Sequence, residues 1–517
     1  MIRLYNTLSK TKENFEPVNP GKVGIYLCGP TVYKPSHIGH MVGPVIFDTI
    51  KRFLVHSGFD VTFVINITDV DDKLITEAAA RKIPMAAVAE EMTADYMRNL
   101  DAMGVDTVDH FPKATDNIHN IITFITDLIE KGYAYESGGD VYFDVQKDDG
   151  YGKLSHRSLE QMLGEGGSTV DRKRSSCDFA LWKTAKPGEP AWDSPWGKGR
   201  PGWHIECSVM SCEILGETFD IHGGGLDLVF PHHENEIAQS ECRHGKPMAK
   251  YWLHNGLMQA SNEVGKVGGR NTRDAEAGNL ESQESGKISK SKGAGSFREL
   301  LKRFEPEVIR FFILSSHYRR PIDFSNERIE QVETSVDGFY RFFKRYHRIT
   351  GDVFYATSIP GTKADGEFDP GDDPFLKQVH ELRAKFFDAM DDDFNTGGGI
   401  GFLFDLLRVL NKYIDDRQLD GATDTPEEVV WLLVHGTTVL REMCLVLGIF
   451  RQAPNSEIAS EKNDEIVHKL MGLIIDLRAN ARKSRDFATA DHIRNVLTEV
   501  GIAIEDRPSG TEWTFTR

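Results

Sequence analysis

A strand, a turn, a helix and a second strand follow one another between residues 23 and 67, and this order constrains the fold most. The apolar patterns predict strands at Val23–Cys28 and Val61–Ile67, with a turn at Gly29–Pro30 and a helix from about His37 to His56 between them. Two buried strands joined by a helix within fifty residues predict a βαβ unit in a parallel sheet. Because ligands bind beyond the carboxyl ends of such strands, we expect a site near Cys28 and His37.

The length of 517 residues predicts three or four domains, at roughly 100–200 residues each. Hydrophobic residues at 40% and charged residues at 27% are typical of globular proteins. No apolar run approaches the roughly 18 residues of a membrane span, and the start from Met1 to Phe15 is polar. We therefore expect a cytoplasmic protein without a membrane partner.

Charge and cysteine content narrow the class further. The net charge of −18 argues against bulk non-specific binding of nucleic acid, but leaves room for a local basic face. The six cysteines are scattered, so a disulfide framework is not expected and a reducing compartment is. Metal ligation or catalysis by some of them stays open.

The rest of the chain divides by composition. Residues from about 115 to 200 hold helical pieces and a Gly/Pro/Trp-rich stretch, which predicts an insertion between two halves of the parallel-sheet domain. Phe219–Phe230 is strand-like with a glycine loop, and residues 262–286 are polar and glycine-rich, as in a flexible loop. From about 327 to 450 the pattern is helical, and the end has helical pieces around Asp464–Ala479 and Ala488–Val500 before a short strand.

The segment His37-Ile38-Gly39-His40 follows the first strand and opens the first helix. His37 and His40 are three residues apart and share a helical face. A helix N-terminus attracts phosphate, two imidazoles can donate hydrogen bonds to a triphosphate, and Gly39 lets an adenine or ribose lie against the backbone. The alternative is a helix cap that happens to hold two histidines.

The segment Lys287-Ile288-Ser289-Lys290-Ser291 supplies charges and hydroxyls suited to a transferring phosphate group. Alone it is also compatible with a solvated basic loop. Together, in this order and on this backbone, the two segments resemble the two ATP-binding signatures of class I aminoacyl-tRNA synthetases, with Ile288 in place of the usual methionine.

Four further residues are candidate metal ligands: Cys28, Cys207, His232 and Glu236. Thiolate, imidazole and carboxylate are all zinc donors. On a helix, the four-residue spacing turns His232 and Glu236 the same way, although His233 is an equal candidate by composition. The alternative is two buried cysteines and a helix cap.

Seven stretches then resemble the cysteinyl-tRNA synthetase family, and they span nearly the whole chain. They are Cys28–His40, Asn66–Lys73, Gly202–Ser208, Asp220–Glu241, Lys287–Ser291, Met390–Thr396 and Asp486–Ile493. Asp220–Glu241 (DIHGGGLDLVFPHHENEIAQSE) is the most specific of them. The resemblance implies that the zinc ligands are Cys28, Cys207, His232 and Glu236.

The resemblance also implies the fold, an α/β protein with a Rossmann-like parallel-sheet catalytic domain that carries an insertion, followed by an all-α helical bundle and a small anticodon-binding domain. The expected divisions are 1–120 and 201–285 for the two catalytic halves, 121–200 for the connective insertion, 286–326 for the lysine-loop segment, 327–455 for the tRNA-contacting bundle and 462–517 for the anticodon-binding domain. The polar stretch 262–286 is longer than the family usually has.

The implied reaction has two steps. Cysteine's carboxylate attacks the α-phosphorus of ATP, and a ribose hydroxyl at the 3′ end of tRNA(Cys) then takes the cysteinyl group. The carboxylate is already ionised, so positioning and charge stabilisation carry the first step. We assign His37 and His40 to the phosphates, and Lys287 and Lys290 to the transition state. Gly39, Ser289, Ser291 and Lys290 are also assigned to ATP binding. Weaker assignments are Thr31 and Asp227 for ATP or the amino group, and Trp203 and His222 for the cysteine pocket.

Zinc would explain the choice of amino acid. A substrate thiol can bind zinc as thiolate, whereas serine's hydroxyl is a harder and far more basic ligand. A pocket that sensed only size would reject such near-isosteres by about 10–200-fold. We also expect Mg²⁺ with ATP, and a monomer.

Two basic runs are candidate tRNA contacts: Tyr340–Arg348, with Arg341, Lys344, Arg345 and Arg348, and Arg478–Arg485. Each is also compatible with a solvated helix face. Trp513 is expected either to stack on an anticodon base or to close the core of the small domain. Two other functions stay open: the cysteine ligase of mycothiol biosynthesis, which lacks the anticodon-binding end, and a non-catalytic tRNA-binding paralogue.

Overall fold

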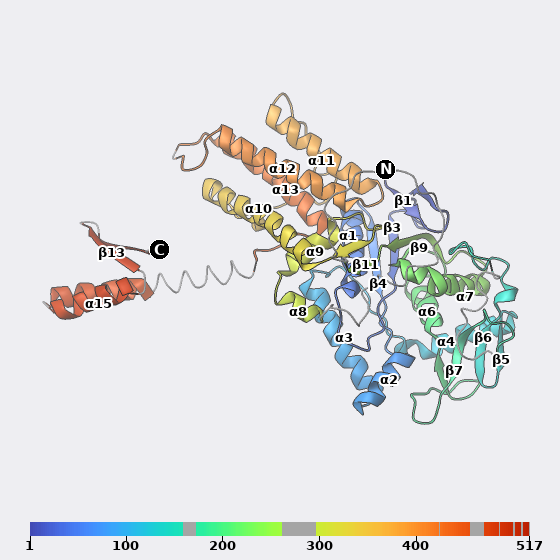
Figure 1. Cartoon of the computed structure of the whole chain (residues 1–517). Coiled ribbons are helices and arrows are strands. Elements are labelled where there is room, and N and C mark those ends of the chain that lie inside the picture. Colours follow the sequence, from blue (N-terminus) through green and yellow to red (C-terminus); the bar gives the residue numbers. More distant parts are fainter. Residues whose placement is uncertain are drawn as a thin grey trace, which may run out of the picture. The chain divides into compact units, whose positions relative to one another are not determined.

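The computed structural model describes residues 1–158, 172–260, 296–422, 424–454, 470–484, 486–499, 502–507 and 510–515. The chain forms two compact units, Met1–Arg451 and Gln452–Arg517, and each is described by itself (Figure 1).

The first unit is built on a parallel sheet of four strands in the order β10-β9-β3-β4. These strands are β3 (Lys22–Leu27), β4 (Asp60–Ile65), β9 (Phe219–Gly225) and β10 (Ala249–Asn255). Helix α1 (Gly39–His56) connects β3 to β4, so the predicted βαβ unit is confirmed. Strands β4 and β9 pair with opposite edges of β3, so the connections after β3 and before β9 run on opposite sides of the sheet. Such a reversal of strand order opens a crevice at the carboxyl end of β3.

Alternating side chains of β3 face two different helices. Ile25 and Leu27 belong to the core that includes α1, whereas Tyr26 packs with Cys207 and Met210 of α6 (Trp203–Leu215). Successive strand residues point to opposite faces, so α1 and α6 cover the two sides of the sheet. This arrangement brings the start of α1 and the start of α6 to the same crevice.

The insertion contains an expected helical piece and also a sheet that the sequence pattern did not predict. Helix α4 (Ile118–Glu130) is followed by an antiparallel sheet in the order β5-β6-β7-β8. These strands are β5 (Ala134–Ser137), β6 (Asp140–Phe143), β7 (Phe179–Thr184) and β8 (Gly199–Pro201). Three of the four are only three or four residues long, which is too short to give a clear alternating pattern.

The predicted helical region is confirmed. Its helices are α10 (Asn326–Thr350), α11 (Pro374–Asp391), α12 (Thr396–Asp416) and α13 (Glu427–Leu447), and α9 (Pro306–Leu314) precedes the predicted region. Side chains cap three of their starts, since Ser325, Asp373 and Asn395 accept hydrogen bonds from backbone N–H groups of the first turn. Smaller elements complete the unit: hairpin β1 (Arg3–Asn6) and β2 (Thr11–Asn14), helices α2 (Asp72–Arg81), α3 (Met85–Ala102), α7 (Glu234–His244) and α8 (Phe297–Leu301), and the parallel pair β11 (Met258–Ala260) and β12 (Ile322–Phe324).

One helix among the described residues, α13, is long and apolar enough to cross a membrane by length and composition. The expectation that no apolar run approaches the length of a membrane span was therefore wrong for this helix. However, 61% of its apolar window is buried inside the protein, where its leucines pack in the bundle core.

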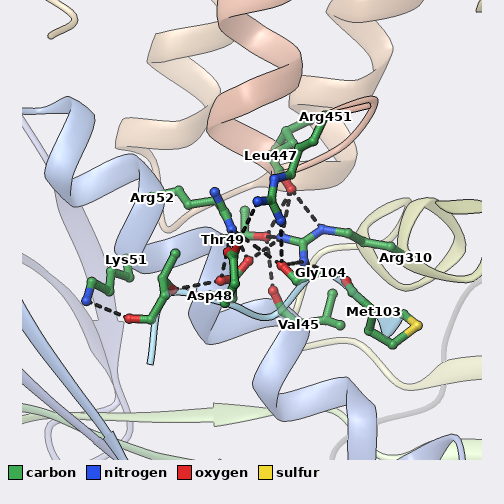
Figure 2. A network of polar contacts seen from close by, with 12 residues as sticks. Val45, Asp48, Thr49, Lys51, Arg52, Met103, Gly104, Arg310, Leu447 and Arg451 are labelled. Atoms are coloured by element: carbon green, nitrogen blue, oxygen red, sulfur yellow. Dashed lines mark hydrogen bonds and ion pairs between the residues drawn. The ribbon is translucent and has the colours of Figure 1, made fainter. Parts of the chain in front are cut away.

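A buried polar network joins α1 to the helical bundle (Figure 2). Arg310 of α9 is 2% exposed and donates to Asp48 and Thr49 of α1 and to the carbonyl oxygen of Leu447 at the end of α13. It also reaches the carbonyl oxygens of Met103 and Gly104, just after α3. The Arg310 guanidinium therefore holds α1, the end of α13 and the loop after α3 against α9.

The second unit contains a helix over residues 470–483, helix α15 (Phe487–Glu499) and the hairpin β13 (Ile502–Arg507) and β14 (Gly510–Phe515). The two helices match the predicted ones approximately, and the strand-like end is a hairpin. Trp513 packs against the small core of Met471, Leu497 and Ile504, which favours its structural role. Arg478 is 4% exposed, so this member of the basic run Arg478–Arg485 is not on the surface.

Candidate active site and metal centre

A cavity of about 530 Å³ lies at the carboxyl ends of β3, β9 and β10. It collects most of the sequence-predicted site residues that the structure describes. Those that line it are Cys28, Thr31, His37, Gly39, His40, Trp203, Cys207, Asp227 and His232. The crevice expected from the strand order is thus also where the predicted side chains meet.

His37 and His40 form one wall of this cavity. Their rings stack with centroids 3.8 Å apart and an interplanar angle of 28°. Gly39 begins α1 between them, and a Cβ added there would lie 3.0 Å from the His37 ring, so a side chain would press on the stack. Burial and the neighbouring His37 lower the pKa of His40 to about 3, which leaves its imidazole neutral at physiological pH. His40 is therefore suited to hydrogen bonding rather than to supplying charge.

The four predicted metal donors come together at the floor of the cavity, where Cys28, Cys207 and His232 line it and Glu236 is fully buried. Their ligand atoms all lie within 4.8 Å of one another. The Cys28 and Cys207 sulfurs are 3.7 Å apart, Cys28 Sγ lies 3.5 Å from Glu236 Oε1, and His232 Nε2 lies 2.9 Å from the same oxygen. Two sulfurs on one tetrahedral zinc at about 2.3 Å each would be separated by about 3.8 Å. The donor chemistry and spacing therefore fit zinc.

Three elements and one loop position these donors. Cys28 follows β3, Cys207 lies on α6, and Glu236 lies in the first turn of α7. His232 lies in the turn Val229–His233, one helical turn before Glu236, as the four-residue spacing predicts. Cys207, His232 and Glu236 are at most 2% exposed.

The charges of this cluster suit a divalent cation. Burial raises the pKa of Cys207, but its contacts with Cys28 and His232 lower that pKa to about 6. Burial likewise raises the pKa of Glu236, and the neighbouring His222 and His232 outweigh this and hold it well below its usual range. A thiolate and a carboxylate, both buried, can be balanced by a metal ion.

A second layer of aromatic side chains holds the donors. His222 Nε2 lies 2.8 Å from Glu236 Oε2, and His204 Nδ1 lies 2.8 Å from His232 Nδ1. The ring of Trp203 stacks on His232 with centroids 4.4 Å apart. Such contacts fix the orientation of a metal ligand and tune its basicity.

The two residues predicted for the amino-acid pocket differ in their access to the cavity. Trp203 lines the cavity and is 38% exposed, whereas His222 is fully buried behind Glu236 and is not among the lining residues. The position of a residue in a sequence motif does not show whether it faces the cavity or lies behind a metal-ligand residue.

The choice between His232 and His233 also follows from the cavity. A second group of four, Cys28, His222, His233 and Glu236, has ligand atoms equally close together. However, His233 is fully buried, and its Nδ1 lies 2.8 Å from His254 Nε2. His232 borders the cavity, which favours it over His233 as the ligand nearer an incoming substrate.

Lys287, Ser289, Lys290 and Ser291, together with the polar stretch 262–286, lie outside the described residues. The described chain resumes beside the site, because the backbone N–H of Phe297 donates to the carbonyl oxygen of Ser36 at 2.9 Å. The residue after Ser36 is His37, so the described chain at Phe297 is held next to the histidine wall.

Sequence reasoning missed several cavity residues. Lys73, Asn66, Thr68, Tyr96 and Asn255 all line the cavity. The stretch Asn66–Lys73 follows β4, and its place at the carboxyl end of a parallel strand was the available signal. Lys73 is the one lysine or arginine that borders the cavity within the described ranges, and His40 is neutral there.

Asn66 also explains a glycine. Its Oδ1 accepts the backbone N–H of Gly29 at 2.8 Å, and a Cβ on Gly29 would lie 1.8 Å from the Asn66 carbonyl oxygen. Only glycine allows the two loops to approach this closely.

Comparison with known families agrees with this geometry. The model of the class I (C) tRNA synthetase catalytic domain matches residues 14–267 and 277–334, and the DALR domain model matches residues 385–451. The break in the first match lies inside the polar stretch 262–286. Mycobacterium tuberculosis methionyl-tRNA synthetase bound by methionyl-adenylate shares the fold, with a TM-score of 0.58 over 82% of this chain and 91% of that one, at 16% identity.

Curated relatives are similar over the full length. The Cysteine--tRNA ligase of Geobacter metallireducens is 44% identical over 521 residues, which cover 99% of both chains. The chain belongs to the cysteine--tRNA ligase family. The enzyme of that name from Geobacillus thermodenitrificans is 43% identical over 99% of this chain and 98% of its own. This coverage includes the C-terminal unit, which the mycothiol enzyme was expected to lack.

The family's tRNA partner draws attention to the basic run on α10. Arg345 forms ion pairs with Asp415 and Asp420, so its charge is already paired within the protein. Arg341, Lys344 and Arg348 are exposed. These three cations are the part of the run that a nucleic acid can reach.

Proposed function

We propose that this chain activates L-cysteine with ATP and transfers the cysteinyl group to the 3′ end of tRNA(Cys), with cysteine selected at a zinc ion held by Cys28, Cys207, His232 and Glu236. The observation that carries the proposal is the convergence of these four donors at the floor of a cavity whose wall is the His37–His40 stack. A sulfur site and a phosphate site thus share one cavity.

The chain's own residues carry the first step by positioning. The ionised carboxylate of cysteine needs no general base, so the site must align it with the α-phosphorus and stabilise the phosphate charge. His37 and His40 donate hydrogen bonds at the start of α1, where backbone N–H groups also point outward. Lys73 adds a positive charge at the cavity edge, and Lys287 and Lys290 act on the transition state. Gly39, Thr31, Asp227, Ser289 and Ser291 contact ATP, which carries Mg²⁺.

The metal would supply a soft Lewis acid that binds the substrate thiol as thiolate. The surrounding residues prepare that site. His222 and His204 orient Glu236 and His232, and Trp203 covers His232 on the cavity side. Serine, which differs from cysteine only in its hydroxyl, would find no comparable ligand bond.

The remaining parts of the chain are assigned to tRNA. We propose residues 1–120 and 201–285 as the catalytic halves, 121–200 as the connective insertion, 286–326 as the lysine-loop segment, 327–455 as the bundle that contacts tRNA, and 462–517 as the anticodon-binding domain. The exposed cations Arg341, Lys344 and Arg348 would face the phosphate backbone. The enzyme acts as a cytoplasmic monomer without a membrane partner.

ATP–pyrophosphate exchange tests the first step. Exchange should depend on cysteine, and serine should support it at least a hundredfold less well. Zinc content, measured on purified wild type and Cys207→Ala, should be close to one per chain in the former and much lower in the latter. Equal stimulation by serine, or no zinc in either protein, would remove the selection mechanism. Charging of tRNA(Cys) tests the second step and separates this function from that of a non-catalytic paralogue.

A further inference from the structure

The loop between α11 and α12 contains a buried carboxylate outside the cavity. Asp393 has a φ of +67° and Phe394 a φ of +50°, so the chain turns sharply through the left-handed region. Asp393 is 0% exposed. It lies in the stretch Met390–Thr396 that the sequence singles out, and no step of the reaction described above uses it.

Asp393 accepts hydrogen bonds from two distant segments. Its Oδ1 accepts the backbone N–H of Tyr5 and the hydroxyl of Tyr318, both at 2.8 Å. Its Oδ2 accepts Nε of Arg319 at 2.7 Å. The guanidinium of Arg319 also lies over the Tyr5 ring, 4.4 Å from its centroid. One carboxylate therefore holds the segment at residues 318–319 against the N-terminal hairpin.

The same segment supports one wall of the cavity. The backbone N–H of Gly256 donates to the carbonyl oxygen of Tyr318 at 2.8 Å, and the N–H of Ile322 donates to that of Leu257 at 3.0 Å. Met258 pairs with Ile322 in the β11–β12 ladder. Gly256, Leu257 and Met258 all line the cavity.

Gly256 shows how closely the two segments fit. A Cβ at Gly256 would lie 2.1 Å from the carbonyl oxygen of Arg320 and 2.7 Å from the nitrogen of Pro321. Both are backbone atoms, so the wall cannot keep its place if residues 318–321 shift. Any displacement of that segment is passed directly to Gly256 and Leu257.

We propose that Asp393 is a positioning residue for ATP, which sets the Gly256–Met258 wall through Tyr318 and Arg319. This inference rests on the function proposed above. Leu257 and Met258 give the wall an apolar surface suited to a nucleobase, while the amino acid is bound at the cysteine and histidine floor of the same cavity. Asp393 contacts neither substrate, so its effect reaches ATP only through the wall.

The substitution Asp393→Asn removes the negative charge and keeps the size of the side chain. Asparagine tolerates a positive φ, so the turn is kept. It offers one acceptor oxygen where the carboxylate has two, and its amide NH₂ would face either the Arg319 guanidinium or the Tyr5 N–H and the Tyr318 hydroxyl. Segment 318–321 would then lose a charge-assisted hydrogen bond that fixes its place.

The test is ATP–pyrophosphate exchange by the full-length enzyme, with KM measured separately for ATP and for cysteine. Asp393→Asn should raise KM for ATP about tenfold, as expected for the loss of one hydrogen bond to a charged group, and leave KM for cysteine within twofold. Tyr318→Phe removes only the hydroxyl and should raise KM for ATP at least twofold. A merely structural role would reduce the active fraction, seen as a lower kcat, without separating the two KM values.

Asp392→Asn is the matched control. Asp392 is the preceding residue, but its side chain is 42% exposed and pairs with Arg3 and Lys12 at the surface. Its KM for ATP should equal that of wild type. An unchanged KM for ATP in Asp393→Asn would overturn the inference, and Tyr318→Phe decides in the same way if the first variant does not fold. Cysteine-dependent exchange by wild type would still support the proposed function in that case. Absence of cysteine-dependent exchange in wild type would overturn both.

Discussion

The guanidinium of Arg310 lies 2.5 Å from the carboxylate of Asp48, and both side chains are fully buried. Asp48 also accepts Nε of Arg52 at 2.9 Å and the Thr107 hydroxyl at 2.7 Å. Burial raises the pKa of Asp48, but Arg310 and Arg52 outweigh it and lower that pKa below the usual range. The pair fixes α9, which follows the lysine segment, to the helix that begins at the histidine wall (Figure 2).

Replacing Arg310 by glutamine is expected to lower the free energy of unfolding by about 3–5 kcal/mol, because Asp48 stays buried with one cation fewer. Urea denaturation followed by circular dichroism measures the change. Lys302→Gln is the control, since Lys302 forms an exposed pair with Glu299 on α8 and should change stability very little. Equal effects of the two substitutions would contradict the structural role of Arg310.

The His40 ring makes stability depend on pH. The unfolded chain takes up a proton at this position near pH 6.5, whereas the folded protein does so only near pH 3. The unfolded state thus binds more protons in this window, and the free energy of unfolding falls as the pH falls, by up to about 1.4 kcal/mol per pH unit. His40→Gln removes this contribution, so the free energy of unfolding of the variant, relative to that of wild type, should rise as the pH falls from 7 to 4.5. A stability difference that does not vary with pH would contradict a His40 imidazole that stays neutral in the folded protein.

Zinc binding is expected to release protons and to tighten as the pH rises. Burial lowers the pKa of His232, but Glu236 and Cys207 beside it raise that pKa to about 10. Burial raises the pKa of the Cys28 thiol. Both groups must lose a proton before they can ligate a metal, so the apparent Kd should fall from pH 6 to pH 8. Competition with a chelator measures this, and an affinity independent of pH would count against these ligands.

Lys73 is expected to contribute to ATP binding. It borders the cavity at the start of α2 and lies over the ring of Tyr33, with Nζ 5.7 Å from its centroid. Lys73→Gln should raise KM for ATP about tenfold, as expected for a lost contact to phosphate. Arg81→Gln, at the far end of the same helix, is the control, because Arg81 pairs with the exposed Glu91. Equal KM values in the two variants would show that Lys73 does not reach the phosphates.

The sequence was most informative where function depends on local order. The strand, glycine turn and helix around Cys28 and His40 could be read from hydrophobic pattern alone, and the βαβ unit is confirmed. The spacing of His232 and Glu236 predicted that both side chains face the same way, and in the structure His232 Nε2 lies 2.9 Å from Glu236 Oε1. The use of these residues as zinc ligands stays a prediction.

Relationships between distant segments could not be read in this way. His222 and Trp203 both lie in family stretches, yet only Trp203 borders the cavity, because His222 is fully buried against Glu236. The role of Asp393 depends on Tyr318, which is 75 residues earlier in the chain. Neither periodicity nor spacing carries information on such pairs. The strands of the insertion were missed for a different reason, since three of the four offer too few residues to show a period.

The buried contacts of α1 have a consequence for dividing the enzyme. His56, at the end of this helix, lies 2.9 Å from Glu442 of α13, and Arg310 binds the carbonyl oxygen of Leu447. A fragment that stopped at residue 334, where the catalytic-domain match ends, would leave both His56 and Arg310 without those partners. Genetic truncation or domain exchange at that boundary would cut through one cooperative core, whereas a cut after Arg451 would follow the natural division of the chain.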